Sequence, residues 1–111
     1  MAEQSPSPEN RGIVEEASVI ADRMLSGRSK KRLAAMRSNP KADFTISDIE
    51  MVASNVGLRS HTKVPGSHRG FSSEHVDAYI LTVPSRRPIK PHYVRQFVRL
   101  CDQHLAAEDA G

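Results

Sequence analysis

The chain has 111 residues, a length that suits one small domain with a tail or an additional helix. No stretch approaches the roughly 18–20 consecutive apolar residues that a membrane helix needs, and the single cysteine, Cys101, excludes an internal disulfide and a cysteine zinc site. The polar, acidic first ten residues lack the basic start and apolar stretch of a signal peptide. We therefore expect a cytoplasmic protein that has no membrane partner and depends on a hydrophobic core.

Basic residues are concentrated in the middle of the chain. Residues 28–100 carry 14 Lys and Arg against five Asp and Glu, a net charge of +9, whereas residues 1–27 and 101–111 each carry −3. A concentrated positive field of this kind is typical of proteins that meet a polyanion. The pattern predicts a nucleic-acid partner, although a surface that is merely basic would give the same counts.

The N-terminal part predicts a leader followed by two helices. Residues 1–10 are polar and contain two prolines, so we expect a disordered leader. Within an extension at residues 11–28, apolar residues at helical spacing over 12–25 predict an amphipathic helix. A short, very basic helix over 28–38 should end at Asn39-Pro40, because a residue before proline avoids helical backbone angles.

The best-marked helix covers residues 45–56. Thr45 and Asp48 have the spacing of a capping box, in which each residue's side chain bonds the other's backbone N–H. Ile46, Ile49, Val52, Ala53 and Val56 fall on one face. Gly57 follows where a left-handed residue commonly ends a helix.

Three short strands are predicted next, at residues 58–64, 67–72 and 78–83, separated by turn residues. A final helix should run over 91–106, with Pro91 at its first position and residues 107–111 as a disordered tail. Its apolar stripe comprises Tyr93, Val94, Phe97, Val98, Cys101 and Leu105, whereas His92, Arg95, Arg99 and Asp102 lie on a different face.

This order predicts an α+β fold in which a helical extension precedes an α-β-β-β-α domain at residues 29–106. Two helices should cover one face of the three-stranded antiparallel sheet and leave the other face open. Phe71 is apolar and should face the helices, so strand alternation places His68 on the open face with Gly70 and Ser72. Gly70 leaves room beside the imidazole.

Four segments in order, within residues 33–103, resemble the HicA-type toxins of bacterial toxin–antitoxin modules. They are SNPKADFTISDI at 38–49, GSHRGF at 66–71, LTVPSRRPIKP at 81–91 and KPHYVRQFV at 90–98. The resemblance implies a double-stranded-RNA-binding-like fold and a ribosome-independent endoribonuclease that cuts mRNA and is neutralised by a HicB-type antitoxin. It also implies that His68 is the catalytic histidine and that Gly66 and Ser67 shape the turn presenting it.

Cleavage of RNA suits a histidine, because the 2′-hydroxyl of RNA is itself the nucleophile and needs only proton transfer. Cations must also stabilise charge on the phosphoryl oxygens. The candidates near the motif in sequence are Lys63, Arg69, Arg86, Arg87 and Lys90. His61 shares the exposed alternation of its strand and is either a second acid–base group or a solvated surface residue.

The remaining histidines, His75, His92 and His104, are expected to be structural or solvent-facing. We expect no metal and no cofactor, because His61, His68 and His75 lack the short spacing of zinc ligands. The partners expected for a toxin are mRNA and an acidic antitoxin that covers the basic face.

Two other functions are compatible with the sequence. The first is a non-catalytic RNA-binding module of the same fold, which would keep the charge but need no free histidine. The second is an interaction subunit that acts through its first helix. That helix could complete the fold, contact a partner, or mediate formation of a homo-oligomer.

Overall fold

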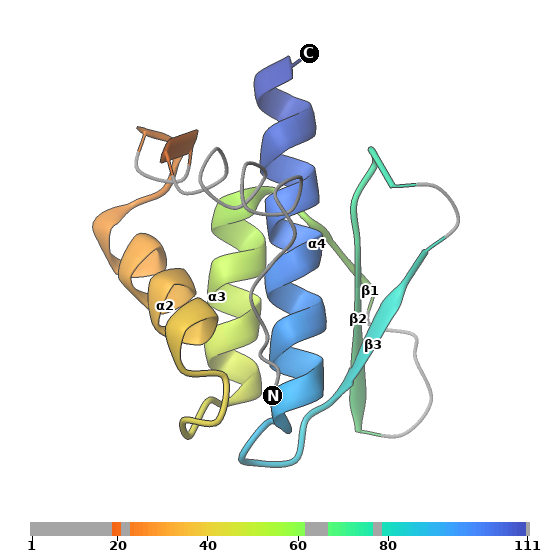
Figure 1. Cartoon of the computed structure of the whole chain (residues 1–111). Coiled ribbons are helices and arrows are strands. Elements are labelled where there is room, and N and C mark those ends of the chain that lie inside the picture. Colours follow the sequence, from red (N-terminus) through yellow and green to blue (C-terminus); the bar gives the residue numbers. More distant parts are fainter. Residues whose placement is uncertain (1–18, 21–22, 62–66, 77–78, 111) are drawn as a thin grey trace, which may run out of the picture.

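The computed structural model describes residues 19–20, 23–61, 67–76 and 79–110. Its elements are α2 (Gly27–Ser38), α3 (Ile46–Val56), β1 (Arg59–His61), β2 (His68–Ser72), β3 (Leu81–Pro84) and α4 (Pro91–Ala110). The strands form one antiparallel sheet in the order β1-β2-β3. The expected α+β class with a three-stranded antiparallel sheet is confirmed (Figure 1).

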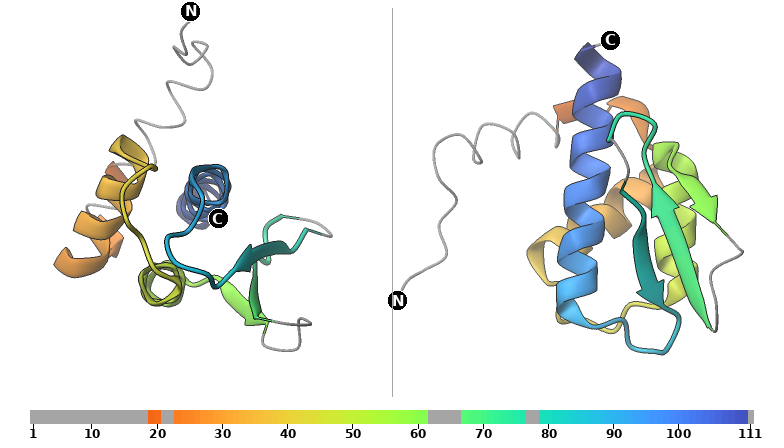
Figure 2. Two further views of the ribbon diagram at one scale, coloured as in Figure 1. Left: turned by 90° about the horizontal axis from the view of Figure 1, so that it is seen from below. Right: turned by 90° about the vertical axis from the view of Figure 1, so that its right-hand side faces the viewer.

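The elements form three layers. Helices α3 and α4 lie between the sheet and α2, which packs on both helices (Figures 1 and 2). Two helices therefore cover one face of the sheet as expected, and α2 adds an outer layer that the sequence did not predict. In the part of the chain that is described, none of the helices has both the length and the apolar character needed to cross a bilayer.

Local sequence signals determine where the helices begin and end. Thr45 N donates to Asp48 Oδ2 at 2.9 Å and Asp48 N donates to Thr45 Oγ1 at 3.3 Å, so the capping box is present. Gly57 ends α3 in the left-handed region with φ 101°. Asn39 ends α2 and Pro91 begins α4, also as predicted.

Several element boundaries differ from the expected ones. Strands β1 and β3 are shorter than predicted, although residues 62–64 and 78 lie outside the described residues. Tyr79 and Ile80 precede β3 and are exposed. Helix α4 continues to Ala110, so residues 107–110 are helical rather than a tail. The leader at 1–10 lies outside the described residues, and only residues 19–20 and 23–25 of the first predicted helix are described.

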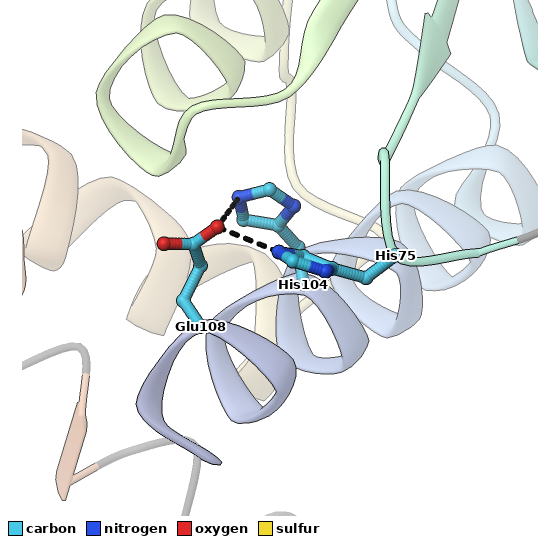
Figure 3. A group of neighbouring side chains, drawn as sticks. All are labelled: His75, His104 and Glu108. Carbon is cyan, nitrogen blue, oxygen red and sulfur yellow. Dashed lines mark hydrogen bonds and ion pairs between the residues drawn. The ribbon is translucent and has the colours of Figure 1, made fainter. Parts of the chain in front are cut away.

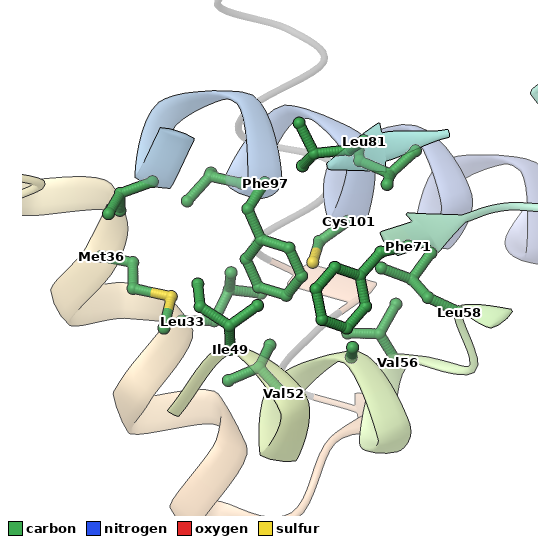
Figure 4. Packing of buried hydrophobic residues seen from close by; sticks show 14 of the residues in the cluster. Leu33, Met36, Ile49, Val52, Val56, Leu58, Phe71, Leu81, Phe97 and Cys101 are labelled. Carbon is green, nitrogen blue, oxygen red and sulfur yellow. The ribbon is translucent and has the colours of Figure 1, made fainter. Parts of the chain in front are cut away.

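The hydrophobic core lies between the helix layers and the sheet (Figure 4). Phe71 of β2 and Phe97 of α4 meet edge to face, with ring centroids 5.8 Å apart. Both rings pack among aliphatic side chains that include Leu33, Met36, Ile49, Val52, Val56, Leu58 and Leu81. Ile20 and Leu25 belong to the same cluster, so the N-terminal extension contributes to the core.

An ion pair joins α2 to α4. Two nitrogens of the Arg37 guanidinium donate to the two carboxylate oxygens of Asp102, at 2.5 and 2.8 Å. Asp102 was expected on the polar face of the final helix, but α2 covers that position and the residue is buried. Bidentate pairing with Arg37 compensates the buried carboxylate.

Candidate functional site

The register of the sheet places His68 on the face that α3 and α4 leave uncovered. Phe71 is paired with Leu81, and both side chains are buried on the helix side. His68 lies three residues before Phe71 and therefore projects to the other side. Among the described residues, no helix stands in front of that side of the sheet (Figure 2, right). The His68 side chain is half-buried there.

Polar side chains surround Gly70 on this face. Gly70 is paired with His61 of β1 and Thr82 of β3, and its neighbours on the same side of β2 are His68 and Ser72. We call these five residues the polar sheet face. The His61 Nε2 and Ser72 Oγ atoms are hydrogen-bonded at 2.8 Å. His61 and His68 are diagonal neighbours across a strand pair, an arrangement that separates residues by about 7–8 Å.

The two histidines of the polar sheet face differ in their hydrogen bonds. His61 is bonded to Ser72, whereas Nδ1 of His68 is buried and has no hydrogen-bond partner within the described residues. Leaving a buried polar atom unsatisfied costs about 1–3 kcal/mol, and among the described residues Ser29 Oγ of α2 is in the same position as His68 Nδ1.

A basic pocket of about 500 Å³ begins where β3 ends. It is lined by Pro84, Arg86, Arg87, Pro88, Lys90 and Tyr93. Pro84, which lines the pocket, is the Cα partner of His68 in the sheet, whereas His68 itself is not among the lining residues. Three of the cations predicted from sequence, Arg86, Arg87 and Lys90, therefore line one pocket at the end of β3.

The cations of the basic pocket differ in their pairing. Arg87 donates to the Asp43 carboxylate at 2.7–3.2 Å, which raises the pKa of Arg87 and lowers the pKa of Asp43. Arg86 and Lys90 are exposed and have no ion pair among the described residues. Tyr93 supplies an aromatic wall, and its ring lies against that of His92 at a centroid distance of 4.0 Å.

The other predicted site residues do not all join this group. Arg69 is paired with Val83 in the register and thus projects to the helix side, where its Nε donates to Glu50 at 3.1 Å. The Ser67 carbonyl accepts hydrogen bonds from the backbone and hydroxyl of Ser85, which ties the start of β2 to the segment after β3. Lys63 and Gly66 lie outside the described residues.

A second polar cluster, which the sequence reasoning missed, lies beyond the other end of β2 (Figure 3). His75 from the β2–β3 connection meets His104 and Glu108 of α4, and His75 Nε2 lies 2.6 Å from Glu108 Oε2. Burial lowers the pKa of His104, and the hydrogen bond from His75 lowers the pKa of Glu108. The spacing of His104 and Glu108, one helical turn apart, was the signal available in the sequence.

Comparison with known protein families, with curated proteins and with solved structures finds no match to this chain. The resemblance to HicA-type toxins therefore depends on the four sequence segments.

Proposed function

We propose that the chain is the toxin of a type II toxin–antitoxin module, an endoribonuclease that cleaves mRNA with His68 as general acid or base. The observation that carries the proposal is the place of His68 on the uncovered face of the sheet, paired with Pro84, a residue that lines the basic pocket. An imidazole next to exposed cations meets the two needs of RNA cleavage, proton transfer and stabilisation of phosphoryl charge.

The reaction needs two proton transfers. A base removes the proton of a 2′-hydroxyl, the oxygen attacks the adjacent phosphorus, the bond from phosphorus to the 5′-oxygen breaks, and an acid protonates that oxygen. His68 is our candidate for one transfer, and His61, which lies on the same face but is hydrogen-bonded to Ser72 on the far side of Gly70, is the candidate for the other. Arg86 and Lys90 are placed to hold a neighbouring phosphate.

The partners follow from the same charges. An RNA-binding surface of this fold contacts backbone and 2′-hydroxyl groups more than base edges, so we expect little sequence preference. A HicB-type antitoxin with an acidic domain would occupy the basic pocket and block His68. Association between such oppositely charged proteins is fast and weakens as salt concentration rises.

One observation favours a second candidate, an RNA-binding module that does not cleave. The Nδ1 atom of His68 is buried, and the side chain is only half-exposed. A histidine held in this way could support the shape of an RNA-binding face without reaching a 2′-hydroxyl. The two candidate functions predict different effects of removing the His68 imidazole.

The decisive experiment compares His68→Ala with the wild-type chain on a labelled RNA, measuring cleavage and affinity separately. We expect cleavage to fall by about 10²–10⁴-fold, the usual contribution of general acid–base catalysis, with affinity changed less than about twofold. A His68→Ala chain that cleaves at the wild-type rate would refute the catalytic role. RNA binding without cleavage by the wild-type chain would identify the non-catalytic module.

A charge-matched pair of variants tests the pocket. Arg86→Gln combined with Lys90→Gln should reduce the slope of log affinity against log salt concentration by about 1.4, since each phosphate contact on a single strand contributes about 0.7. Arg28→Gln combined with Arg95→Gln removes the same charge from exposed sites outside the pocket and should change the slope little. Equal effects of the two pairs would show that the pocket has no special role in RNA binding.

A further inference from the structure

The cluster of His75, His104 and Glu108 gathers three side chains whose ligand atoms all lie within 4.8 Å of one another. Nε2 of each histidine lies toward Oε2 of Glu108, and the carboxylate oxygen stands between the two imidazoles (Figure 3). The cluster lies beyond Ser72, at the end of β2 opposite His68. A strand rises about 3.3 Å per residue, so five residues from His68 to Ser73 separate the two sites by roughly 17 Å.

The distances are close to those of a metal shell. Zinc binds imidazole nitrogen at about 2.0–2.1 Å and carboxylate oxygen at about 2.0–2.2 Å, so neighbouring ligands of a tetrahedral site lie about 3.4 Å apart. His104 Nε2 lies 3.8 Å from Glu108 Oε2, and His75 Nε2 lies 2.6 Å from that oxygen. Shifts of about 1.5 Å or less reach the metal geometry, and the side chains of His75 and Glu108 are 29% and 38% exposed.

A neighbouring serine holds the ring of His104, the most buried of the three side chains. The side chain of His104 is 4% exposed, and its Nδ1 lies 2.7 Å from Ser73 Oγ, which also accepts a hydrogen bond from the backbone N–H of His75. When Nδ1–H donates to Ser73, the lone pair of Nε2 points into the cluster. Metal-binding histidines are commonly held by such a hydrogen bond on the other ring nitrogen.

A second carboxylate, that of Glu74, lies next to the cluster. Glu74 Oε2 lies 3.6 Å from His75 Nε2, and the other oxygen of Glu74 lies 3.7 Å from Arg59. Nε2 of His104 makes no hydrogen bond within the described residues, because its nearest acceptor in the cluster, on Glu108, is at 3.8 Å. A metal ion bound between the three side chains would use this nitrogen as a ligand.

We propose that His75, His104 and Glu108 bind one divalent transition-metal ion of the zinc type, and that the ion fixes the β2–β3 connection to the C-terminal half of α4. The role is structural, because the cluster is distant from His68 and the basic pocket. His104 and Glu108 lie at positions i and i+4 of α4, a spacing that presents two ligands on one face of a helix. The inference is independent of the proposed function.

The test uses the untagged full-length chain after removal of metals with a chelator, because a histidine tag would bind the probe. We expect calorimetric titration to find one Zn²⁺ bound per chain and the midpoint of thermal unfolding to rise when Zn²⁺ is added. Co²⁺ as a second probe should give the visible absorption of a four-coordinate site. Failure of the stripped chain to bind either ion at micromolar concentration would overturn the proposal.

Matched variants separate a specific site from adventitious binding. Glu108→Gln retains an oxygen that accepts the hydrogen bond from His75 but removes the charged ligand, so it should fold without metal and bind Zn²⁺ about 100-fold more weakly or worse. Ser73→Ala should weaken binding about 10–100-fold. The control is His92→Ala, which removes an exposed histidine of the same helix and should bind as the wild type does. Equal affinities of Glu108→Gln and His92→Ala would overturn the proposal.

Discussion

At the scale of single residues, the pairing of Arg37 with Asp102 has the largest expected effect on stability. The side chains are 23% and 8% exposed, so water screens this pair much less than an ordinary surface ion pair. The hydrogen bond to Asp102 raises the pKa of Arg37, as expected for two charges that stabilise each other. Loss of either partner would leave an uncompensated charge between α2 and α4.

We therefore expect Arg37→Met to lower the free energy of unfolding by about 3 kcal/mol, near the lower end of the values for broken buried pairs. The control, Arg95→Met, removes the same charge from an exposed position on α4 and should change stability by less than about 0.5 kcal/mol. Chemical denaturation of both variants measures the difference. If the two substitutions cost the same, the ion pair does not compensate a buried carboxylate.

The pattern of residues in the final helix did not predict that Asp102 would be buried. Helical spacing assigns Asp102 to the same polar side as Arg95 and Arg99, which are exposed. Nothing local to the final helix indicates that α2, more than 60 residues earlier in the chain, covers Asp102. Strand alternation did better, because it placed His68 opposite Phe71 from the sequence alone. The same rule places Arg69 on the face of Phe71, so it also predicts that the Arg69 side chain projects away from the His68 imidazole.

At the scale of elements, Gly57 controls how α3 ends. Its φ of 101° lies in the left-handed region, and a Cβ atom built there would lie 3.3 Å from His104 Nε2. We expect Gly57→Ala to reduce stability by about 1–2 kcal/mol, through backbone strain and this close contact.

The matched control is Gly27→Ala at the start of α2, where a Cβ would meet nothing within 4 Å. In a helix this change should be neutral or stabilise by a few tenths to about 1 kcal/mol. Thermal unfolding of both variants tests whether the two substitutions change stability in opposite directions. A Gly57→Ala chain as stable as Gly27→Ala would exclude strain at the end of α3.

Element ends were predictable where the signal is local, and strand lengths were not. The capping pair Thr45 and Asp48 determines the start of α3 through side chains within one turn. Tyr79 and Ile80 have high strand propensity, yet they lie exposed before β3, because a strand also needs a paired neighbour. The cluster around His104 was missed for a related reason. Its third member, His75, comes from a loop 29 residues earlier in the sequence.

At the scale of the whole molecule, the N-terminal extension helps to complete the core. Ile20 is 1% exposed and packs in the core cluster, whereas its neighbour Val19 is 58% exposed. Of the roles expected for the extension, completion of the fold is thus the one with contacts in the described residues.

We expect Ile20→Ala to lower the free energy of unfolding by about 3 kcal/mol, within the range for deletion of buried aliphatic groups. Val19→Ala removes a neighbouring aliphatic side chain from an exposed site and should cost less than about 0.5 kcal/mol. Denaturant titration of the two full-length variants measures both changes. A small loss for Ile20→Ala would mean that the extension is dispensable for folding.

The layered arrangement also offers a way to attach the protein without obstructing its sheet. Burial raises the pKa of the Cys101 thiol well above its ordinary value, so the native cysteine should react slowly with maleimides. Ala34 is exposed on α2, the layer farthest from the strands. A cysteine introduced there would be the most readily labelled thiol. A fluorophore or sensor chip coupled to it would leave the polar sheet face turned toward the solution.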